Sequence, residues 1–334
     1  MKRQGQLTEK IAAIENLQSA FIKAKKGKSD RAEIIKYGRQ LSENLTKLQG
    51  QILSGRVEAG NYYCFTIFDP KKRLICAAPF SQRVLHHGLM NICHEYFDKT
   101  QIYDSYASRP GKGTVAALER AKYFNKKYRW FLKLDFRKYF DSIDHNVLHN
   151  QLQKRFKDRR LLVIFKTIID SYQLDVNRGI PIGNLTSQYF ANHYLAATDH
   201  YAKEILKVRA YVRYMDDIVL WHNDKAVLLD CGLRLKQYSE ARLHLTLKQY
   251  CLNQNTKGLP FLGYLLFRNH LRLSHRSRVR FIKKMRVYQS NLNDGIWGQE
   301  EYQAHVLPLI AFTQYANARN FRSTVLEKMM IDGQ

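Results

Sequence analysis

The segment YVRYMDDIVL, residues 211–220, sets two adjacent carboxylates inside an apolar sequence that is rich in β-branched and aromatic residues. Such residues on both sides of Met215–Asp216 predict two short strands joined by a tight turn at that dipeptide. Asp is favoured in turns, so the pair alone could reflect turn chemistry. The apolar flanks, and a second acidic segment earlier in the chain, favour a functional site instead.

The second acidic segment is FLKLDFRKYFDSIDH, residues 131–145, in which Asp135 ends the predicted strand FLKLD. Carboxylates at the end of one strand and in the turn of a neighbouring hairpin can meet at one edge of a sheet. Two hard cations bridged by carboxylates are what in-line phosphoryl transfer uses, one at the attacking oxygen and one at the leaving pyrophosphate. The sequence therefore predicts a site for two Mg²⁺ ions at Asp135, Asp216 and Asp217.

Hydrophobic periodicity predicts an α+β fold. Helical patterns cover 7–55, most of 83–127, 145–156, 160–170 and 275–334, and strand patterns cover 62–68, 73–80, 129–136, 209–223, 243–247 and 259–274. A helix over 186–206 is predicted to begin at a Thr or Ser cap, and the last hairpin is predicted to turn around Arg268–Asn269. Strand, helices, hairpin and strand in this order are compatible with a split βαβ unit.

Charge is the strongest signal in the composition. The 55 Lys and Arg exceed the 29 Asp and Glu by enough for a formal net charge of +26, which predicts a polyanionic partner. Aromatic residues, 12% of the chain with 21 Tyr, add surfaces on which bases can stack. An anionic membrane or acidic protein is the alternative partner, but no basic amphipathic helix stands out as an anchor and no run is apolar enough to span a bilayer.

The cysteines are scattered, with no Cys-x-x-Cys pair: Cys64, Cys76, Cys93, Cys231 and Cys251. This spacing predicts a reduced, cytoplasmic protein with neither a disulfide framework nor a zinc knuckle. His86, His87 and His94 lie on one predicted helix beside Cys93. Without a carboxylate or second cysteine at ligand spacing, helix packing or RNA contact suits these histidines better than a metal site.

Several segments together resemble reverse transcriptases, in the right order from Tyr62 to Ser274. YMDD resembles their catalytic hairpin, FLKLDFRKYFDSIDH their first acidic motif in group II intron and related bacterial enzymes, YASRPGKGT (106–114) a finger motif, and LPFLGYLLF (259–267) the primer-grip hairpin. Most such families carry Gln-Gly and Ser-Pro at the two ends of the loop that is GIPIGNLTSQ (179–188) here. The corresponding pairs Ile182-Gly183 and Ser187-Gln188 resemble the enzymes of diversity-generating retroelements, as does 69–87.

The resemblance implies a right-hand polymerase with fingers, a ferredoxin-like palm and a short helical thumb. We expect an N-terminal helical extension at 1–55, fingers at 56–127, a palm at 128–274 with finger-palm helices at 145–178, and the thumb at 275–334. It also implies copying of a retroelement template RNA into cDNA from dNTPs, with errors at template adenines. A small basic accessory protein that forms a ring-like oligomer is implied as a partner beside the template RNA and the RNA–cDNA duplex.

The resemblance carries roles for individual residues. Asp135 and Asp216 are the implied metal ligands, with Asp217 close by and the Phe136 carbonyl as a further oxygen ligand. The implied nucleotide-binding residues are Lys71, Arg73, Phe140, Ile182 and Gly183, and the implied template or RNA contacts are Asn184, Gln188, Arg109, Arg276 and Arg278. Phe140 falls at the steric gate that would exclude a ribose 2′-OH. It could instead be a core aromatic, although neighbouring Tyr139 suits the core better.

Two other functions stay open at this point. A reverse transcriptase of the group II intron type, or an antiphage one, would share these motifs without a mutagenic role. A non-catalytic RNA-binding protein could use the same scaffold, but the intact Asp135, Asp216 and Asp217 argue against it.

Overall fold

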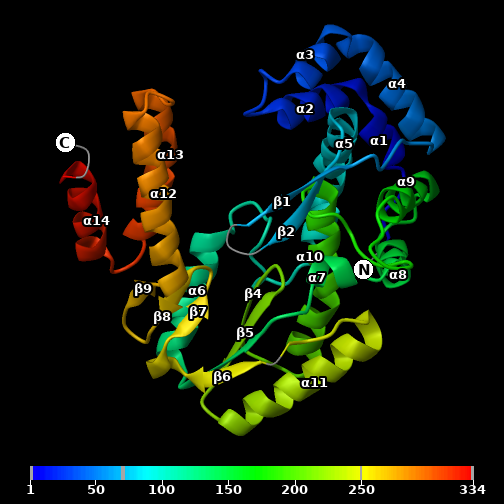
Figure 1. The fold of residues 1–334 in the computed structure, drawn as a ribbon. Coiled ribbons are helices and arrows are strands. Elements are labelled where there is room, and N and C mark those ends of the chain that lie inside the picture. The colour runs from blue at the N-terminus through cyan, green and yellow to red at the C-terminus, as the bar shows by residue number, and fades with distance from the viewer. Residues whose placement is uncertain (1–2, 69–71, 249, 332–334) are drawn as a thin grey trace.

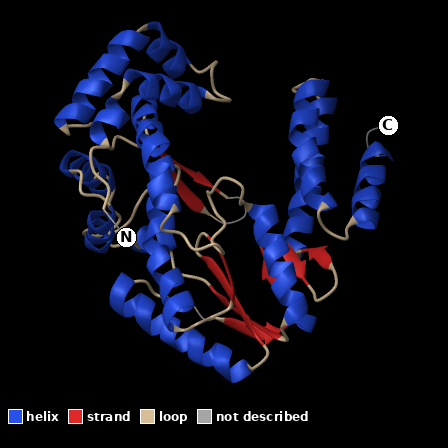
Figure 2. Cartoon of the chain, turned by 180° about the vertical axis from the view of Figure 1, so that it is seen from behind, coloured by secondary structure: helices blue, strands red, loops and turns tan. Residues whose placement is uncertain are grey.

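The computed structural model describes residues 3–68, 72–248 and 250–331. It confirms a mixed α+β chain in which helices surround three small antiparallel sheets (Figures 1 and 2). Within these ranges, no helix combines the length and the apolar character that crossing a bilayer requires.

The N-terminal part of the chain forms a helical layer that packs on the long helix α5 (Phe80–Asp98). Its helices are α1 (Thr8–Ala12), α2 (Ile14–Lys25), α3 (Ala32–Arg39) and α4 (Leu41–Ser54). Leu17 of α2 and Leu45 and Ile52 of α4 are buried in the shared core, as the helical spacing of these residues predicts. Figure 1 shows this layer at the end of α5 farthest from the central sheet.

A two-stranded hairpin, β1 (Tyr63–Ile67) and β2 (Arg73–Ala77), follows the helical layer. Its register sets Cys64 directly opposite Cys76, and a disulfide joins them. The prediction of five unpaired cysteines is therefore wrong for these two. Scattered positions in the sequence say nothing about strand register, and register alone brings the two sulfur atoms together. Cys93, Cys231 and Cys251 are free.

The central sheet has the strand order β4-β5-β3-β6 with every neighbour antiparallel. Its strands are β3 (Trp130–Leu134), β4 (Ala210–Tyr214), β5 (Asp217–His222) and β6 (Cys251–Gln254). Helix α10 (Leu185–His200) precedes β4, and α11 (Lys225–Leu243) joins β5 to β6. This connection order agrees with the predicted split βαβ unit.

Strands β3, β4 and β5 of the central sheet are mostly buried on both faces, which explains why these three strands read as nearly continuous apolar runs. Leu132 and Leu220 join the core that also contains residues of α10 and α11. Phe131, Val219 and Trp221, which alternate with them, join a second core that includes residues of α6 (Thr114–Lys127). The two-residue period of the strands thus assigns successive side chains to different cores.

The remaining elements fall into two groups along the chain. Between β3 and β6 these are α7 (Tyr139–Ser142), α8 (His145–Arg155), α9 (Arg159–Asp170) and the π-helical turn Tyr201–Ile205. After β6 these are the 3₁₀ turn Asn255–Lys257, the strands β7 (Leu259–Phe261), β8 (Tyr264–Leu266) and β9 (Leu271–Leu273), and the helices α12 (His275–Asn293), α13 (Gln299–Gln314) and α14 (Arg319–Ile331). Figure 2 shows α12–α14 rising from one side of the central sheet, while α1–α4 lie on the other.

Three local predictions need correction. Residues 243–247 do not form a strand: Leu243, Leu245 and Leu247 are buried alternately, but the segment pairs only through one isolated bridge, Phe136↔Leu247. The strand that pairs with β3 is instead β6, whose polar sequence does not predict a strand.

The turn at Arg268–Asn269 is present between β8 and β9, and a second turn at Leu262–Gly263 makes a three-stranded sheet. Helix α10 begins after Asn184 rather than at a Thr or Ser cap.

Candidate active site

The hairpin turn lies where the sequence predicts it. Tyr214 pairs with Asp217, and Met215 and Asp216 make the turn between β4 and β5. Met215 has φ +54°, in the left-handed region that costs a side-chain-bearing residue about 1–2 kcal/mol. The surrounding structure must therefore hold this turn in place.

Strand register brings the two acidic segments together. The last pair between β3 and β5 is Leu134↔Ile218, so the next residues in the antiparallel register, Asp135 and Asp217, extend from the same edge of the sheet. The backbone around Asp135 is also fixed by residues 246–248. The Lys248 N–H donates to the Asp135 carbonyl at 2.8 Å, and the Arg137 N–H donates to the Thr246 carbonyl at 2.9 Å.

The carboxylates repel one another across this edge. Burial raises the pKa of Asp216 to about 6, with the negative charges of Asp217 and Asp135 adding to the effect. Two lysines partly offset the excess negative charge. Lys248 Nζ lies 2.5 Å from an Asp135 oxygen, and Lys133 Nζ lies 3.1 Å from an Asp217 oxygen.

The chemistry of these residues fits a hard divalent cation. Carboxylate oxygens are the ligands that such cations prefer, and a bound cation would relieve the repulsion that raises the pKa of Asp216. In the described ranges, however, no three His, Cys, Asp or Glu side chains are already close enough to hold a metal ion. Lys248 occupies only Oδ2 of Asp135, so a cation bound at that oxygen would have to displace the lysine. The ring of Phe136 is buried, and the role of its carbonyl oxygen stays a prediction.

Comparison with known proteins adds the evidence of descent. Residues 69–266 match the family described as Reverse transcriptase (RNA-dependent DNA polymerase). The chain belongs to the reverse transcriptase family. It therefore contains an RNA-dependent DNA polymerase domain.

Among its relatives, Protein YkfC of Escherichia coli is 24% identical over 303 residues, which cover 74% of this chain and 79% of that protein. The Putative COX1/OXI3 intron 2 protein of Saccharomyces cerevisiae is 24% identical over 249 residues, 55% of this chain and only 29% of the yeast protein. The structure of telomerase from Candida albicans with a fragment of telomeric RNA aligns with a TM-score of 0.52 at 13% identity, covering 83% of this chain and 56% of that one. That likeness supports the fold.

The structure describes four of the five residues with an implied nucleotide-binding role. Phe140 is half-buried, whereas Tyr139 is buried and its hydroxyl donates to the Ala191 carbonyl, so Tyr139 is the core aromatic of the pair. Arg73 is exposed on β2. Lys71 lies outside the described residues.

The loop before α10 lies against β2. The Cys76 N–H donates to the Ile182 carbonyl at 2.8 Å, and the Ile182 side chain is half-buried. A Cβ on Gly183, whose φ is +126°, would lie 3.0 Å from an Ile75 methyl carbon and 3.2 Å from the Cys76 carbonyl oxygen. Glycine is therefore required at 183 by the close approach of β2.

Two of the implied RNA contacts are engaged inside the protein. Asn184 is buried and its side-chain oxygen accepts from the Ala78 N–H at 3.1 Å, which links the start of α10 to the residue after β2. Arg109 pairs with Asp98 at 2.6 Å and donates to the carbonyls of Ile102 and Ser105, which brace the loop before α6. A template contact for either residue stays a prediction. Gln188, Arg276 and Arg278 are exposed, with Gln188 accepting a hydrogen bond from Ser108 at 3.1 Å and Arg278 lying over the Phe321 ring.

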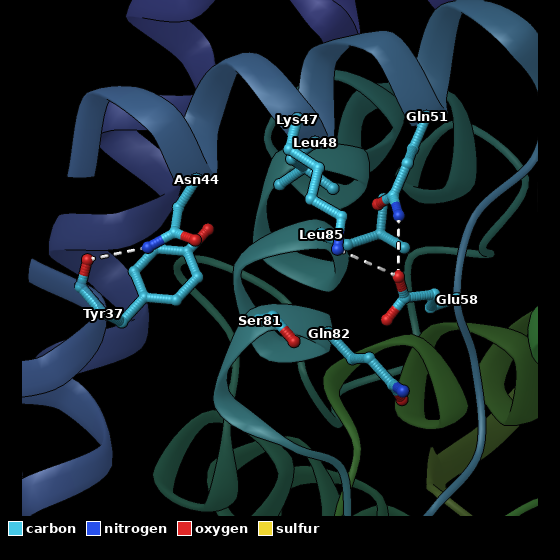
Figure 3. Close-up of a pocket in the computed structure, with 9 residues that line it drawn as sticks. All are labelled: Tyr37, Asn44, Lys47, Leu48, Gln51, Glu58, Ser81, Gln82 and Leu85. Atoms are coloured by element: carbon cyan, nitrogen blue, oxygen red, sulfur yellow. Dashed lines mark hydrogen bonds and ion pairs between the residues drawn. The ribbon is translucent and has the colours of Figure 1, made fainter. Parts of the chain in front are cut away.

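The three histidines of α5 do not form a metal site with one another. His86 is buried, and burial lowers its pKa to about 3, so it is a neutral packing residue. His94 hydrogen-bonds the Tyr189 hydroxyl at 2.9 Å. Figure 3 shows a separate pocket between α4 and the start of α5, where the exposed Glu58 carboxylate accepts a hydrogen bond from Gln51 and forms an ion pair with Lys47.

Sequence reasoning missed three charged residues around the carboxylates: Lys133, Lys248 and Arg213. Lys133 is the one polar residue within the apolar strand WFLKL, which is a usable signal. Lys248 follows 243–247, whose alternating pattern predicts a strand, and Arg213 lies inside an apolar hairpin next to YMDD. A charged side chain between buried neighbours needs a partner of opposite charge or a hydrogen-bond acceptor, and only the structure identifies that partner.

Proposed function

We propose that this reverse transcriptase extends a DNA primer on an RNA template, using two Mg²⁺ ions held by Asp135 and Asp216 with Asp217 beside them. The observation that carries the proposal is the register of β3 and β5, which directs Asp135 and Asp217 from one sheet edge next to the Asp216 turn. When bound, the metal ions would supply charge stabilisation at the phosphates. The chain would supply the fixed positions of the carboxylates.

The parts of a right hand follow from the same proposal. We assign the fingers to 56–127, the palm to 128–274 and the thumb to 275–334, with 1–55 as an N-terminal extension. Exposed Arg73 would then meet the triphosphate, and the exposed arginines Arg276 and Arg278 of α12 would meet the template–product duplex. The half-buried ring of Phe140 would limit space at the ribose 2′ position.

Primer extension on a generic RNA template, with a labelled DNA primer, dNTPs and Mg²⁺, tests the activity. Asp216→Asn removes a charged oxygen ligand without changing side-chain size, and it should abolish extension while primer–template binding persists. Lys236→Gln, on the outer part of α11, is a matched surface control that should extend like wild type. An active Asp216→Asn variant would refute the metal-site assignment.

We further propose that the enzyme copies a retroelement template with low fidelity, as the resemblance of the Ile182 loop to diversity-generating retroelements implies. A reverse transcriptase without a mutagenic role is the competing function, and the likeness to the Putative COX1/OXI3 intron 2 protein favours it. Sequencing of the cDNA decides between them, because only the first predicts substitutions concentrated at template adenines. The small basic ring-forming accessory protein belongs to the first proposal alone.

A further inference from the structure

Arg213 of β4 is completely buried, and every N–H of its guanidinium has an acceptor. Nε donates to Asp199 at 2.8 Å, and Nη2 donates to the other Asp199 oxygen at 2.7 Å and to Gln101 Oε1 at 2.8 Å. Nη1 donates to Asn192 Oδ1 at 3.0 Å and to the Met215 carbonyl at 3.0 Å. The five donors of arginine are thus all used.

Four of these bonds end on side chains of α10 or of the loop after α5, but the fifth ends on the backbone of the catalytic turn. Met215 directly precedes Asp216, and its φ of +54° is unfavourable for a residue with a side chain. A hydrogen bond from a fixed cation to the Met215 carbonyl offsets that strain. It also sets the orientation of the peptide group that leads into Asp216.

Stability alone does not account for an arginine here. A buried ion pair seldom stabilises a fold more than well-packed apolar residues of the same volume would. A guanidinium can, however, bind the Asp199 carboxylate through one edge and reach a backbone carbonyl with another nitrogen, because its donors lie in a rigid plane. No apolar residue could do this, and lysine has only one nitrogen.

We propose that Arg213 is a positioning residue that acts through the Met215 carbonyl to hold Asp216 where a divalent cation is bound. The Arg213–Asp199 pair serves as the fixed base of this contact. The inference rests on the proposed function, since it concerns the same carboxylate.

The test compares Arg213→Lys with Tyr211→Phe. Lysine keeps a charge beside Asp199 but cannot also span to Met215. Tyr211→Phe removes a 2.6 Å hydrogen bond to the same Asp199 oxygen from the same strand and does not touch Met215, so it controls for weakening of the cluster. Thermal melting establishes that each variant folds.

Two measurements follow on folded protein. The first is the Mg²⁺ concentration that half-saturates primer extension, and the second, without Mg²⁺ or substrate, is amide hydrogen exchange in the peptide that contains 214–217. We expect Arg213→Lys to raise the half-saturating Mg²⁺ concentration about five- to tenfold and to speed exchange at the turn. Tyr211→Phe should lower the melting temperature and leave both values near wild type.

Wild-type values for Arg213→Lys in both measurements would overturn the inference, and so would equal shifts in the two variants, which indicate a merely structural role. A wild-type protein that fails to extend any primer would instead refute the proposed function. The exchange measurement would still report on Arg213 and Met215 in that event.

Discussion

The backbone N–H of Cys76 donates a 2.8 Å hydrogen bond to the backbone carbonyl of Ile182. Strand β2 thereby holds the loop before α10, and Gly183 allows the close approach. Because this bond uses no side-chain atom of Ile182, the side chain at that position can change without release of the loop. Its chemistry can then be tested separately from its position.

Ile182→Gln should lower the misincorporation frequency while extension persists. Isoleucine gives only van der Waals contact, whereas an amide can hydrogen-bond near the sugar and base of the incoming nucleotide. One neutral hydrogen bond contributes about 0.5–1.5 kcal/mol, and 1.36 kcal/mol is about tenfold in rate, so errors should fall by a few-fold to about tenfold. Sequencing of cDNA made on one template by both enzymes measures the change.

Ile182→Val is the matched control, because it keeps an apolar, β-branched side chain. Its error frequency should equal that of wild type. If active Ile182→Gln makes as many errors as wild type, the side chain only packs under the loop and does not affect fidelity.

In the absence of Mg²⁺, Asp216→Asn should make the protein more stable. Burial and the neighbouring carboxylates raise the pKa of Asp216 from 3.8 to about 6, so the folded state resists its ionisation. The resulting cost is fully present above pH 6 and is relieved as pH falls toward 4, where the native carboxyl is protonated. At about 1.36 kcal/mol per pKa unit, the cost is about 3 kcal/mol.

Thermal melting in EDTA at several pH values checks this expectation. The variant should melt higher than wild type at pH 7.5, and the difference should shrink by pH 5. Saturating Mg²⁺ should stabilise wild type more than the variant. A difference that does not change with pH would mean that Asp216 carries no raised pKa in the folded protein.

The sequence predicts much of the site because its signals are local. An apolar strand that ends in Asp135 and an apolar hairpin that turns at Met215–Asp216 need no knowledge of distant residues, and both elements lie where they are predicted. Burial across both sheet faces makes these strands easy to recognise. Strand β6 is polar, and none of its residues is fully buried, so its sequence predicts no strand.

What the sequence cannot predict depends on pairing between distant segments. The Cys64–Cys76 bond requires the register of β1 and β2, and the internal role of Asn184 requires the approach of Ala78. Lys248 and Asp135 are 113 residues apart and meet only because 246–248 runs beside the end of β3. The internal hydrogen bonds of Arg109 and Asn184 are likewise hidden in the sequence, because a polar side chain in a loop can bind backbone inside the protein as well as a ligand.

Replacement of both Arg276 and Arg278 by Gln should weaken RNA–DNA duplex binding and reduce its dependence on salt. Both side chains are exposed on α12, and each phosphate contact releases counterions when it forms. Loss of two contacts should reduce the slope of log affinity against log salt by about 1.5 to 2. Binding titrations between about 50 and 300 mM salt measure the slope.

The control replaces Lys236 and Arg242 of α11, which removes the same charge from a helix that lies below the central sheet, away from α12 (Figure 1). This control should lower the slope little. Equal loss in the two double variants would show that net charge acts as a whole and that α12 makes no specific contact.

Phe140→Ala should raise incorporation of ribonucleotides relative to deoxynucleotides. The ring of Phe140 is half-buried one residue after Tyr139, which takes the core position, and we propose that the exposed part of the Phe140 ring faces the incoming nucleotide. Removal of the ring opens space for a 2′-OH, so the ratio of the two incorporation efficiencies, each as kcat/KM, should shift toward ribonucleotides by tenfold or more. Tyr139→Phe provides the comparison: loss of its hydrogen bond to Ala191 should cost about 1 kcal/mol of stability and leave sugar selection unchanged. If Phe140→Ala discriminates like wild type while it still extends primers, another residue excludes the 2′-OH and Phe140 belongs to the core.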